Sequence, residues 1–267
     1  MRALEEARGV AKFIWKHPAN QDRRFRQLTR AARFQLGARL FGTRYQTQIG
    51  DKGGRIWVDL HRTAATKALY ANPPDWPHML VWRARLRAGT IFIDVGANIG
   101  TYSIMAASLG AEVIALEPAK DTAELLRENV ALNGFSVDVI EAAAGREAGT
   151  THFTAGQDCI NQVDPSGDVI VPVVTLDSII GERHVTGMKV DVEGFEFDVL
   201  LGCMRALQDH RIDLLQLEWN SAGDRAPVSR LMLDLGYRFF EPTDSGELEE
   251  RHSLKTGADL FAAPINR

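Results

Sequence analysis

The chain has 267 residues, of which 45% are hydrophobic and 25% are charged, and these proportions are those of an ordinary soluble globular protein. Its formal net charge of −4 divides unevenly: residues 1–44 hold eleven Lys and Arg but three Asp and Glu, a net charge of +8, which leaves −12 on the other residues. No apolar run approaches the roughly 20 residues that a membrane-spanning helix needs, the N-terminus lacks the apolar core of a signal peptide, and Cys159 and Cys203 lack the spacing of a zinc site.

Residues 1–88 are predicted to form a cap region made of helices and a hairpin. The helical pattern is interrupted near residues 17–20, where a proline and an asparagine occur. A hairpin is expected over residues 46–60, around a turn at 51–54. A stiff Pro-rich loop at residues 72–77 then leads into a short helix. This part of the chain carries no motif that indicates a function.

The segment 23–41 has the spacing of an amphipathic helix, with apolar residues on one face and arginines on another. The apolar set is Phe25, Leu28, Ala32, Leu36 and Leu40, and the basic set is Arg23, Arg26, Arg30 and Arg33. We favour a solvated cap that packs on the core or on a second subunit, so a homodimer is one expected state. A basic amphipathic helix also suits the surface of an anionic membrane. The acidic remainder of the chain, and the absence of a basic patch interleaved with aromatic residues, argue against nucleic acid.

From residue 90 onwards, short apolar runs alternate with stretches that suit helices. The first run, Ile91–Val95, is apolar apart from its aspartate, as expected of a central parallel strand. Four further strands are expected at Glu112–Leu116, Val137–Ile140, Met188–Val190 and Leu214–Leu217, and two closing antiparallel strands at Tyr237–Phe240 and Asp259–Ala262. The pattern predicts a doubly wound, Rossmann-like α/β sandwich with a mostly parallel sheet and helices on both faces. We assign residues 89–267 to this domain, with a hairpin insertion near 150–175.

The loop after the first strand has the form D-x-G-x-N-x-G. Its glycines let the backbone turn tightly and approach a ligand at contact distance. The spacing differs from the G-x-G-x-x-G of dinucleotide-binding loops, and a carboxylate at this place would oppose a pyrophosphate. S-adenosylmethionine has no phosphate, and an acidic strand end attracts its ammonium group. We predict that this cofactor contacts Asp94, Gly96, Ala97, Asn98, Gly100 and Thr101. A tight turn without a ligand is the alternative.

Glu117 ends the second strand, where doubly wound folds place an acid that accepts hydrogen bonds from both ribose hydroxyls. Pro118 then breaks the strand. After the third strand, the small residues around Ala143 are suited to lie against the face of an adenine ring, although loop flexibility explains them almost equally well. Glu117, Pro118 and Ala143 complete the predicted cofactor contacts.

Carboxylates gather where two later strands end. Asp191 and Glu193 are two positions apart, so in a strand they share a face, and Glu218 ends the next strand along the chain. These side chains are candidates to hold the methionine ammonium, to act as a general base, or to ligate a divalent ion. We name Glu193, Asp191 and Glu218 as the candidate catalytic residues and Asp191 as a further cofactor contact. His61 and His78 precede the core and rank below the carboxylates.

Four segments together resemble the FkbM family of methyltransferases, and the similarity runs roughly from residue 90 to residue 218. The segments are Phe92–Gly100, Ala115–Pro118, Thr175–Ser178 and Lys189–Gly194. The resemblance implies the class I methyltransferase fold and O-methylation, often of a sugar hydroxyl in a polysaccharide, glycolipid or natural product. It also implies cofactor contacts at Asp94, Gly96, Asn98 and Glu117. Asn98 replaces the middle glycine of the wider methyltransferase loop, as it does in the FkbM pattern.

The sequence therefore predicts an S-adenosylmethionine-dependent O-methyltransferase that acts on a small-molecule or glycan acceptor. A non-catalytic nucleoside-binding scaffold and an NAD-linked oxidoreductase are the alternatives. No metal is predicted, although a divalent ion is compatible with the carboxylates. We expect a cytoplasmic protein, at the inner face of the membrane if the basic helices contact lipid, with reduced and idle thiols.

Overall fold

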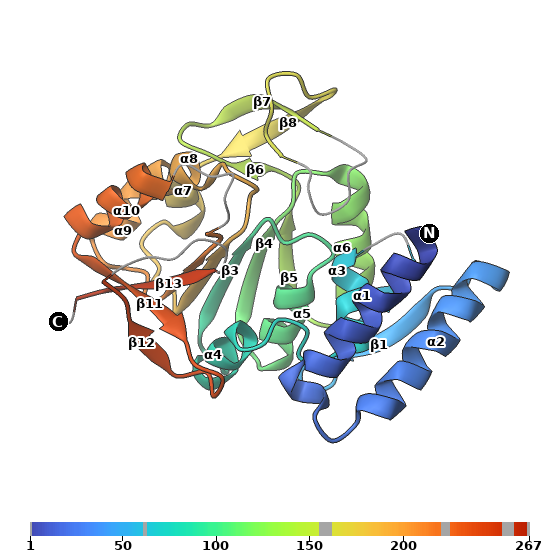
Figure 1. Cartoon of the computed structure of the whole chain (residues 1–267). Helices are drawn as coiled ribbons and strands as arrows, with labels where there is room; N and C mark the ends of the chain where they lie inside the picture. Colours follow the sequence, from blue (N-terminus) through green and yellow to red (C-terminus); the bar gives the residue numbers. More distant parts are fainter. Residues whose placement is uncertain (1, 61–62, 155–161, 220–224, 253–258, 266–267) are drawn as a thin grey trace.

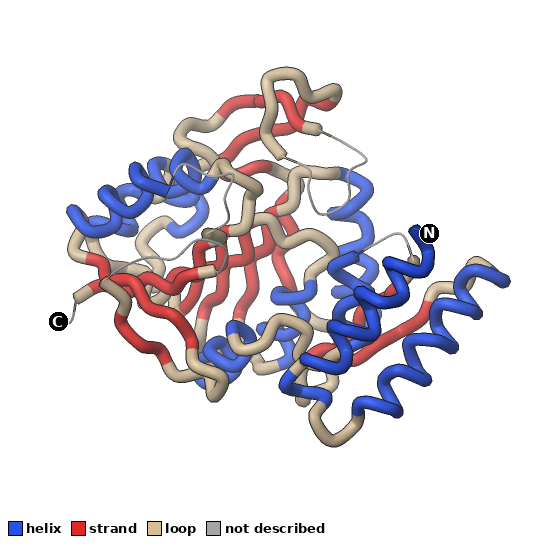
Figure 2. The backbone as a smooth tube through the Cα atoms, in the orientation of Figure 1, coloured by secondary structure: helices blue, strands red, loops and turns tan. Residues whose placement is uncertain are grey.

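The computed structural model describes residues 2–60, 63–154, 162–219, 225–252 and 259–265. A large sheet of eight strands forms the centre of the molecule (Figure 1, Figure 2). In spatial order its strands are β12 (Leu248–Glu250), β11 (Tyr237–Pro242), β13 (Leu260–Pro264), β10 (Leu215–Leu217), β9 (Gly187–Val190), β3 (Ile91–Val95), β4 (Glu112–Leu116) and β5 (Val137–Ile140).

The strand pairing of the large sheet confirms the predicted fold class. β10, β9, β3, β4 and β5 are parallel to one another, whereas β13 and β11 run antiparallel to their neighbours and extend the sheet beyond β10, as expected. In the register of the central strands, Asp94 lies opposite Lys189 on one side and Ala115 on the other. Because parallel strands end at the same edge, the side chains that follow β3, β4, β9 and β10 meet there.

Helices cover both faces of the large sheet, as the sequence predicts. Side chains alternate along a strand, so Phe92 of β3 enters one apolar cluster and Ile93 enters the other. The first cluster includes side chains of α4 (His78–Arg85), α5 (Thr101–Ser108) and α6 (Lys120–Asn133). The second is covered by α7 (Leu176–Ile180), α8 (Glu196–Leu201), α9 (Met204–Gln208) and α10 (Arg225–Asp234), which lie together on one side of the sheet in Figure 1.

The N-terminal region shares the first of these clusters with the large sheet. Its elements are α1 (Arg2–Lys16), the short 3-10 helix η1 (Pro18–Asn20), α2 (Arg24–Phe41), β1 (Tyr45–Ile49), β2 (Gly54–Val58) and α3 (Thr63–Tyr70). Trp82 of α4 is fully buried, and its ring centroid lies 5.1 Å from that of Phe92 and 5.5 Å from that of Phe261. Its Nε1 donates a hydrogen bond of 2.6 Å to Gln216 on β10. β1 and β2 form the hairpin predicted over residues 46–60. One core contains residues from both sides of residue 88, and a domain boundary there stays a prediction.

The packing face of α2 is not the apolar stripe that the spacing indicates. The residues of α2 that are buried are Ala31, Phe34 and Ala38. Phe25, Leu36 and Leu40 are 76%, 62% and 65% exposed. Spacing alone identifies the helix, but α1 and α3, which contact it, decide which face is covered.

The predicted hairpin insertion is present as part of a second, smaller sheet of three strands. These strands are β6 (Ala143–Ala144), β7 (Gly149–Phe153) and β8 (Val169–Val174). Cys159 lies outside the described residues, whereas Cys203 is a buried free thiol whose pKa is raised by burial. Within the described part of the chain, none of the helices is long and apolar enough to cross a membrane.

Candidate active site

The loop after β3 turns sharply because two of its glycines take left-handed conformations, with φ of 77° at Gly96 and 90° at Gly100. A Cβ at Gly96 would collide with the carbonyl oxygen of Asp191, so glycine is needed for the loop to lie against the segment after β9. A Cβ at Gly100 would meet the end of the Leu126 side chain of α6, and the φ of 90° itself favours glycine there. Asn98 between them has a φ of 51°. The loop therefore lies close to two other parts of the chain, the segment after β9 at Gly96 and α6 at Gly100.

Glu117 is held in place by backbone N–H groups on either side. Its Oε2 accepts a hydrogen bond of 2.9 Å from the N–H of Asn98, and its Oε1 accepts one of 2.9 Å from the N–H of Ala119. The residue is buried, with 6% of its surface exposed. These two bonds fix the direction of the carboxylate. This orientation is compatible with the predicted bonds to the hydroxyls of a ribose.

A narrow cavity of about 60 Å³ lies beside Glu117. Small residues at 142–144 form one side of it, and Phe195 forms another. Phe153 and Val163, from the hairpin insertion, close it further. The small residues beside Glu117 are those predicted to face the base of a nucleoside. The insertion thus contributes to the wall of the predicted nucleoside site.

A larger cavity of about 530 Å³ opens on the other side of the same loop. It shares four lining residues with the narrow cavity, so one elongated ligand can reach both. The shared residues are Gly96, Asn98, Asp191 and Glu193. Its remaining wall includes residues of the N-terminal region, namely Phe13, His17, Lys67, Pro74, Asp75 and Trp76. No residue of the hairpin insertion lines this cavity within the described chain, so the insertion contributes to the narrow cavity alone.

Three carboxylates meet at the junction of the two cavities. Oxygen atoms of Asp191, Glu193 and Glu218 lie within 4.8 Å of one another. Glu193 has a φ of 53°, a backbone conformation that few residues other than glycine adopt. Burial raises the pKa of Glu193, and the negative charges of Asp191 and Glu196 raise it further. Within the described chain, no hydrogen bond or ion pair reaches its carboxylate. Glu193 is therefore a carboxylate of raised pKa that is open to a ligand.

A buried lysine lies among these acids. Lys189 is 5% exposed, and its Nζ donates a hydrogen bond of 2.6 Å to Oδ2 of Asp191 and lies 5.0 Å from the ring centroid of Tyr102. Burial lowers the pKa of Lys189, but the charges of Asp191, Asp94 and Asp259 outweigh burial and raise it overall. Lys189 is therefore charged. The sequence motif contains this lysine, but periodicity gives no sign that it points into the site.

Asp94 is buried more deeply than its position near the end of β3 suggests. It is 1% exposed, and its Oδ2 accepts a hydrogen bond of 2.6 Å from Oγ of Ser103 on α5. Burial raises the pKa of Asp94, and the nearby charge of Lys189 opposes this shift without cancelling it. Asp94 is among the residues that line the larger cavity, and its attraction for a cationic group of the cofactor stays a prediction. Lys189 already supplies one positive charge to it.

A chain of buried hydrogen bonds continues behind the larger cavity. The hydroxyl of Tyr102 donates to Asp75 and accepts a bond of 3.2 Å from Nε2 of Gln216. His78 bridges Asp75 and the carbonyl of Asp259, at 3.2 Å each. Burial lowers the pKa of His78, but Asp75 outweighs burial and raises it overall. His78 is therefore a structural member of this network.

Comparisons with known proteins identify the family. The model of a family described as the methyltransferase FkbM domain matches residues 94–239, more than half of the chain. The chain belongs to the FkbM family of methyltransferases. This assignment confirms the resemblance found in the sequence.

The methyltransferase is also similar to a protein of described activity. It is 30% identical over 145 residues to the hexuronic acid methyltransferase AglP of Haloferax volcanii. The alignment covers 52% of this chain and 59% of that protein, so the chain spans less than two thirds of the length of its relative.

Solved structures with a similar fold are more distant. One is an S-adenosylmethionine-dependent O-methyltransferase from Thermotoga maritima, with 12% identity, coverage of 85% of this chain and 94% of that one, and a TM-score of 0.45. Another is a tRNA (uracil-54, C5)-methyltransferase from Pyrococcus abyssi in complex with S-adenosyl-L-homocysteine, with 14% identity, coverage of 82% and 43%, and a TM-score of 0.47. The family assignment rests on the family model and not on these structures.

Most of the predicted site residues of the methyltransferase line one of the two cavities. Those on the larger cavity are Asp94, Gly96, Ala97, Asn98, Thr101, Asp191, Glu193 and Glu218. Those on the narrow cavity include Glu117, Pro118 and Ala143. Gly100 lines neither and packs against Leu126. His61 lies outside the described residues. The roles of all these residues toward cofactor and acceptor stay predictions.

The carboxylate trio also has the donor set of a divalent-ion site. Asp191, Glu193 and Glu218 each offer one oxygen atom, and Mg²⁺ and Ca²⁺ prefer such ligands. Lys189 bonds one of these carboxylates and reduces the negative charge that a metal would meet. The residues therefore fit either a metal or a cationic ligand.

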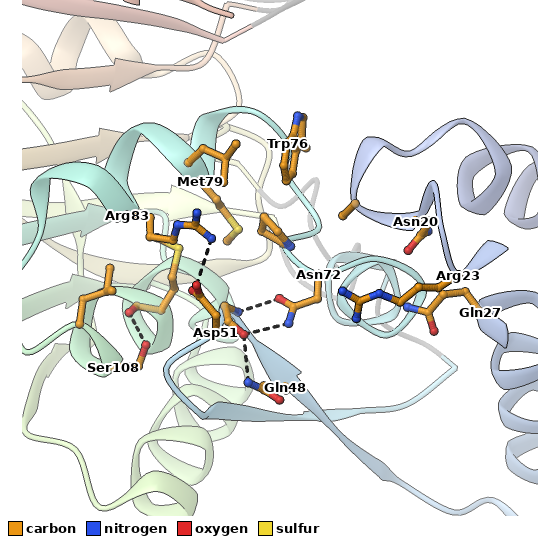
Figure 3. Close-up of a pocket in the computed structure, with 16 residues that line it drawn as sticks. Asn20, Arg23, Gln27, Gln48, Asp51, Asn72, Trp76, Met79, Arg83 and Ser108 are labelled. Carbon is orange, nitrogen blue, oxygen red and sulfur yellow. Dashed lines mark hydrogen bonds and ion pairs between the residues drawn. The ribbon is translucent and has the colours of Figure 1, made fainter. Parts of the chain in front are cut away.

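A further cavity of about 500 Å³ lies next to the Pro-rich loop (Figure 3). Polar groups around it bond to one another: Asn72 exchanges two hydrogen bonds with Gly50, of 2.7 and 2.8 Å, and Arg83 pairs with Asp51 at 3.1 Å. Trp76 lines both this cavity and the larger one. These bonds fix the Pro-rich loop, and with it one aromatic wall of the larger cavity.

Proposed function

We propose that the methyltransferase transfers the methyl group of S-adenosylmethionine to a hydroxyl group of a sugar, with Glu193 as the general base. The observation that carries this proposal is the junction of the two cavities. The narrow cavity lies beside the acid that we assign to the ribose, and the larger cavity of about 530 Å³ lies on the other side of the loop. Glu193 lines both cavities, which supports a role for it between cofactor and acceptor.

In this proposal the cofactor extends across both cavities. Glu117 accepts hydrogen bonds from the ribose hydroxyls, because its two backbone bonds already aim the carboxylate at the narrow cavity. The apolar residues at 142–144 and the ring of Phe195 enclose the base. The methionine half then points past Gly96 into the larger cavity, where Asp94 and Asp191 attract its ammonium group. Gly96 permits this path because a side chain would close the approach to Asp191.

The bound cofactor supplies a methyl group on a positively charged sulfur, which an oxygen atom displaces in line. An alcohol is a poor nucleophile near neutral pH, so the protein must remove its proton as the new bond forms. Glu193 is suited to accept that proton because its pKa is raised and its carboxylate is open. The carbon–oxygen bond forms, the carbon–sulfur bond breaks with its electron pair on sulfur, and the hydroxyl proton passes to Glu193. Lys189 holds Asp191 in place beside the reacting atoms.

We further propose that the acceptor is an acidic sugar. Phe13 and Trp76 give the larger cavity aromatic surface, which suits the apolar face of a sugar ring. Lys67 lines the same cavity, its side chain is exposed, and none of the described residues forms an ion pair with it. An ammonium group in this position can bind a carboxylate on the acceptor. The curated relative is a hexuronic acid methyltransferase, which supports this choice.

Methyl transfer to a panel of glycosides tests the proposal. The protein is incubated with methyl-labelled S-adenosylmethionine and with matched glucuronides and glucosides, and labelled product is separated and counted. We expect label on the uronic acids, and a loss of that preference in Lys67→Met. Binding of S-adenosylhomocysteine without transfer to any glycoside would favour the nucleoside-binding scaffold. Tight binding of NAD in its place, measured by calorimetry, would favour the oxidoreductase.

A further inference from the structure

The outer face of α2 is apolar although nothing in the described chain covers it. Phe25, Leu36 and Leu40 recur at helical spacing and are 76%, 62% and 65% exposed. The opposite face of the same helix carries the buried residues Ala31, Phe34 and Ala38. The helix therefore has two apolar faces, and one of them is used for packing. Figure 1 shows α2 at the edge of the molecule, with α1 between it and the large sheet.

The exposed stripe continues onto α1 at one end. Trp15 of α1 is 45% exposed, and its ring meets that of Phe25 edge-on, with centroids 5.7 Å apart. Trp15, Phe25, Leu36 and Leu40 form what we call the outer stripe. Single exposed apolar residues are ordinary, but a row of them along one edge is typical of a surface that contacts a membrane or another protein.

Arginines border the outer stripe. By helical spacing, Arg26 and Arg33 lie along one side of it and Arg39 lies along the other. Arg24 lies over the ring of Trp15, 5.2 Å from its centroid. Residues 1–44 carry a net charge of +8 within a chain whose net charge is −4. Long basic side chains beside an apolar row suit the interface of a membrane, because the stems cover apolar surface while the guanidinium groups reach lipid phosphates.

A second copy of the chain matches this surface poorly. Two copies that meet through the same face would bring their arginines together, which is unfavourable. The acidic part of a second copy has the charge that the arginines of α2 would attract. Among the described residues of that part, however, the large apolar side chains that are exposed lie on different elements, far apart in the sequence. These are Val169 and Ile170 on β8, Leu233 on α10 and Ile265 near the C-terminus.

We propose that α2 docks this methyltransferase on the surface of an anionic phospholipid membrane, with the outer stripe in the apolar layer and the flanking arginines on lipid phosphates. Phe13 of α1 and His17, which follows α1, line the larger cavity. The proposal does not depend on the identity of the acceptor or on the proposed chemistry.

Co-sedimentation with vesicles tests the docking. The full chain is mixed with vesicles of phosphatidylcholine alone and with vesicles that also contain phosphatidylglycerol. We expect binding to the anionic vesicles, weakened by added salt. The variant Phe25→Ser/Leu36→Ser/Leu40→Ser should lose at least about tenfold in partition coefficient, because the burial of three large side chains is removed. The variant Arg26→Glu/Arg33→Glu should lose binding by a similar factor at low salt.

Matched controls separate the outer stripe from a general effect of exposed residues. Ile170→Ser/Leu233→Ser/Ile265→Ser removes three apolar side chains that are 64%, 55% and 50% exposed elsewhere. Arg87→Glu/Arg230→Glu changes the charge by the same amount away from α2. Both controls should bind anionic vesicles as the wild type does. Unchanged melting temperature and unchanged affinity for S-adenosylhomocysteine would show that each variant is folded.

Three results would overturn the proposal. The first is an absence of wild-type binding to anionic vesicles. The second is an equal loss of binding in the control variants. The third is a wild-type dimer in light scattering that becomes a monomer in the stripe variant without any vesicle binding, which would make the outer stripe a subunit interface.

Discussion

Replacing Gly96 by alanine probes the contact on which both cavities depend. The residue has a φ of 77°, and a Cβ would collide with the carbonyl oxygen of Asp191. A left-handed conformation costs about 1–2 kcal/mol for a residue with a Cβ, and a collision with backbone adds roughly 1–3 kcal/mol because neither side can rotate away. Gly89→Ala is the matched control, since Gly89 has a φ of 83° but no atom within 4 Å of the added Cβ.

We expect both variants to melt below the wild type, by about 2–4 °C for each kcal/mol lost in a chain of this size. Gly96→Ala should fall at least about twice as far as Gly89→Ala, because it carries the collision as well as the strain. Calorimetry with S-adenosylhomocysteine should show affinity at least about tenfold weaker for Gly96→Ala, since the loop must leave the junction, and unchanged affinity for Gly89→Ala. Equal melting temperatures, or wild-type affinity in Gly96→Ala, would refute the role given to this contact.

Three further substitutions test separate parts of the site. Glu117→Ala should weaken S-adenosylhomocysteine binding about 10–100-fold, because charged hydrogen bonds to the ribose are lost; an unchanged dissociation constant would remove Glu117 from the cofactor site. Glu193→Gln should lower kcat about 10²–10⁴-fold with little change in cofactor affinity, and equal losses in both would make Glu193 a cofactor ligand. Because the pKa of Glu193 is raised above 4.5 and the base must be ionised, wild-type kcat should fall as the pH drops through that raised value; an acid limb centred below pH 4.5 would contradict this. Lys189→Met should destabilise the fold by about 3–5 kcal/mol at neutral pH, since Asp191 and Asp94 lose their buried counter-ion. The pKa of Asp94 rises further in this variant because Lys189 no longer opposes the effect of burial, so its deficit in chemical denaturation should shrink as the pH is lowered and Asp94 becomes protonated; a deficit independent of pH would argue against the charge pairing.

Much of the large sheet could be predicted because its strands are short apolar runs between turn residues. The expected strands 91–95, 112–116 and 137–140 have the bounds that the structure gives them. The helix that precedes Gly134 ends there, since this glycine has a φ of 65° that suits a helix terminus. Periodicity and turn chemistry are local properties, and here the local preferences agree with the final fold.

Features that depend on distant neighbours could not be predicted. Lys189 lies in a strand whose residues are all buried, and its place among acids follows from the register that sets it opposite Asp94. Phe13 and His17 carry no motif, and they reach the larger cavity because of how α1 packs. Gly100 belongs to the cofactor motif, yet Leu126 fills the space that a side chain at this position would occupy. A motif gives residue types, whereas tertiary packing decides what each one touches.

The shared core of the N-terminal region and the large sheet has a consequence for engineering. The wall of the larger cavity is built on helices whose inner residues pack with Phe92, Val113 and Phe261 of the sheet. Trp82 of α4 also bonds Gln216 of β10. Residues 1–88 therefore cannot be exchanged with those of a relative as an independent module. The exchanged segment must be recombined together with the sheet face on which it packs.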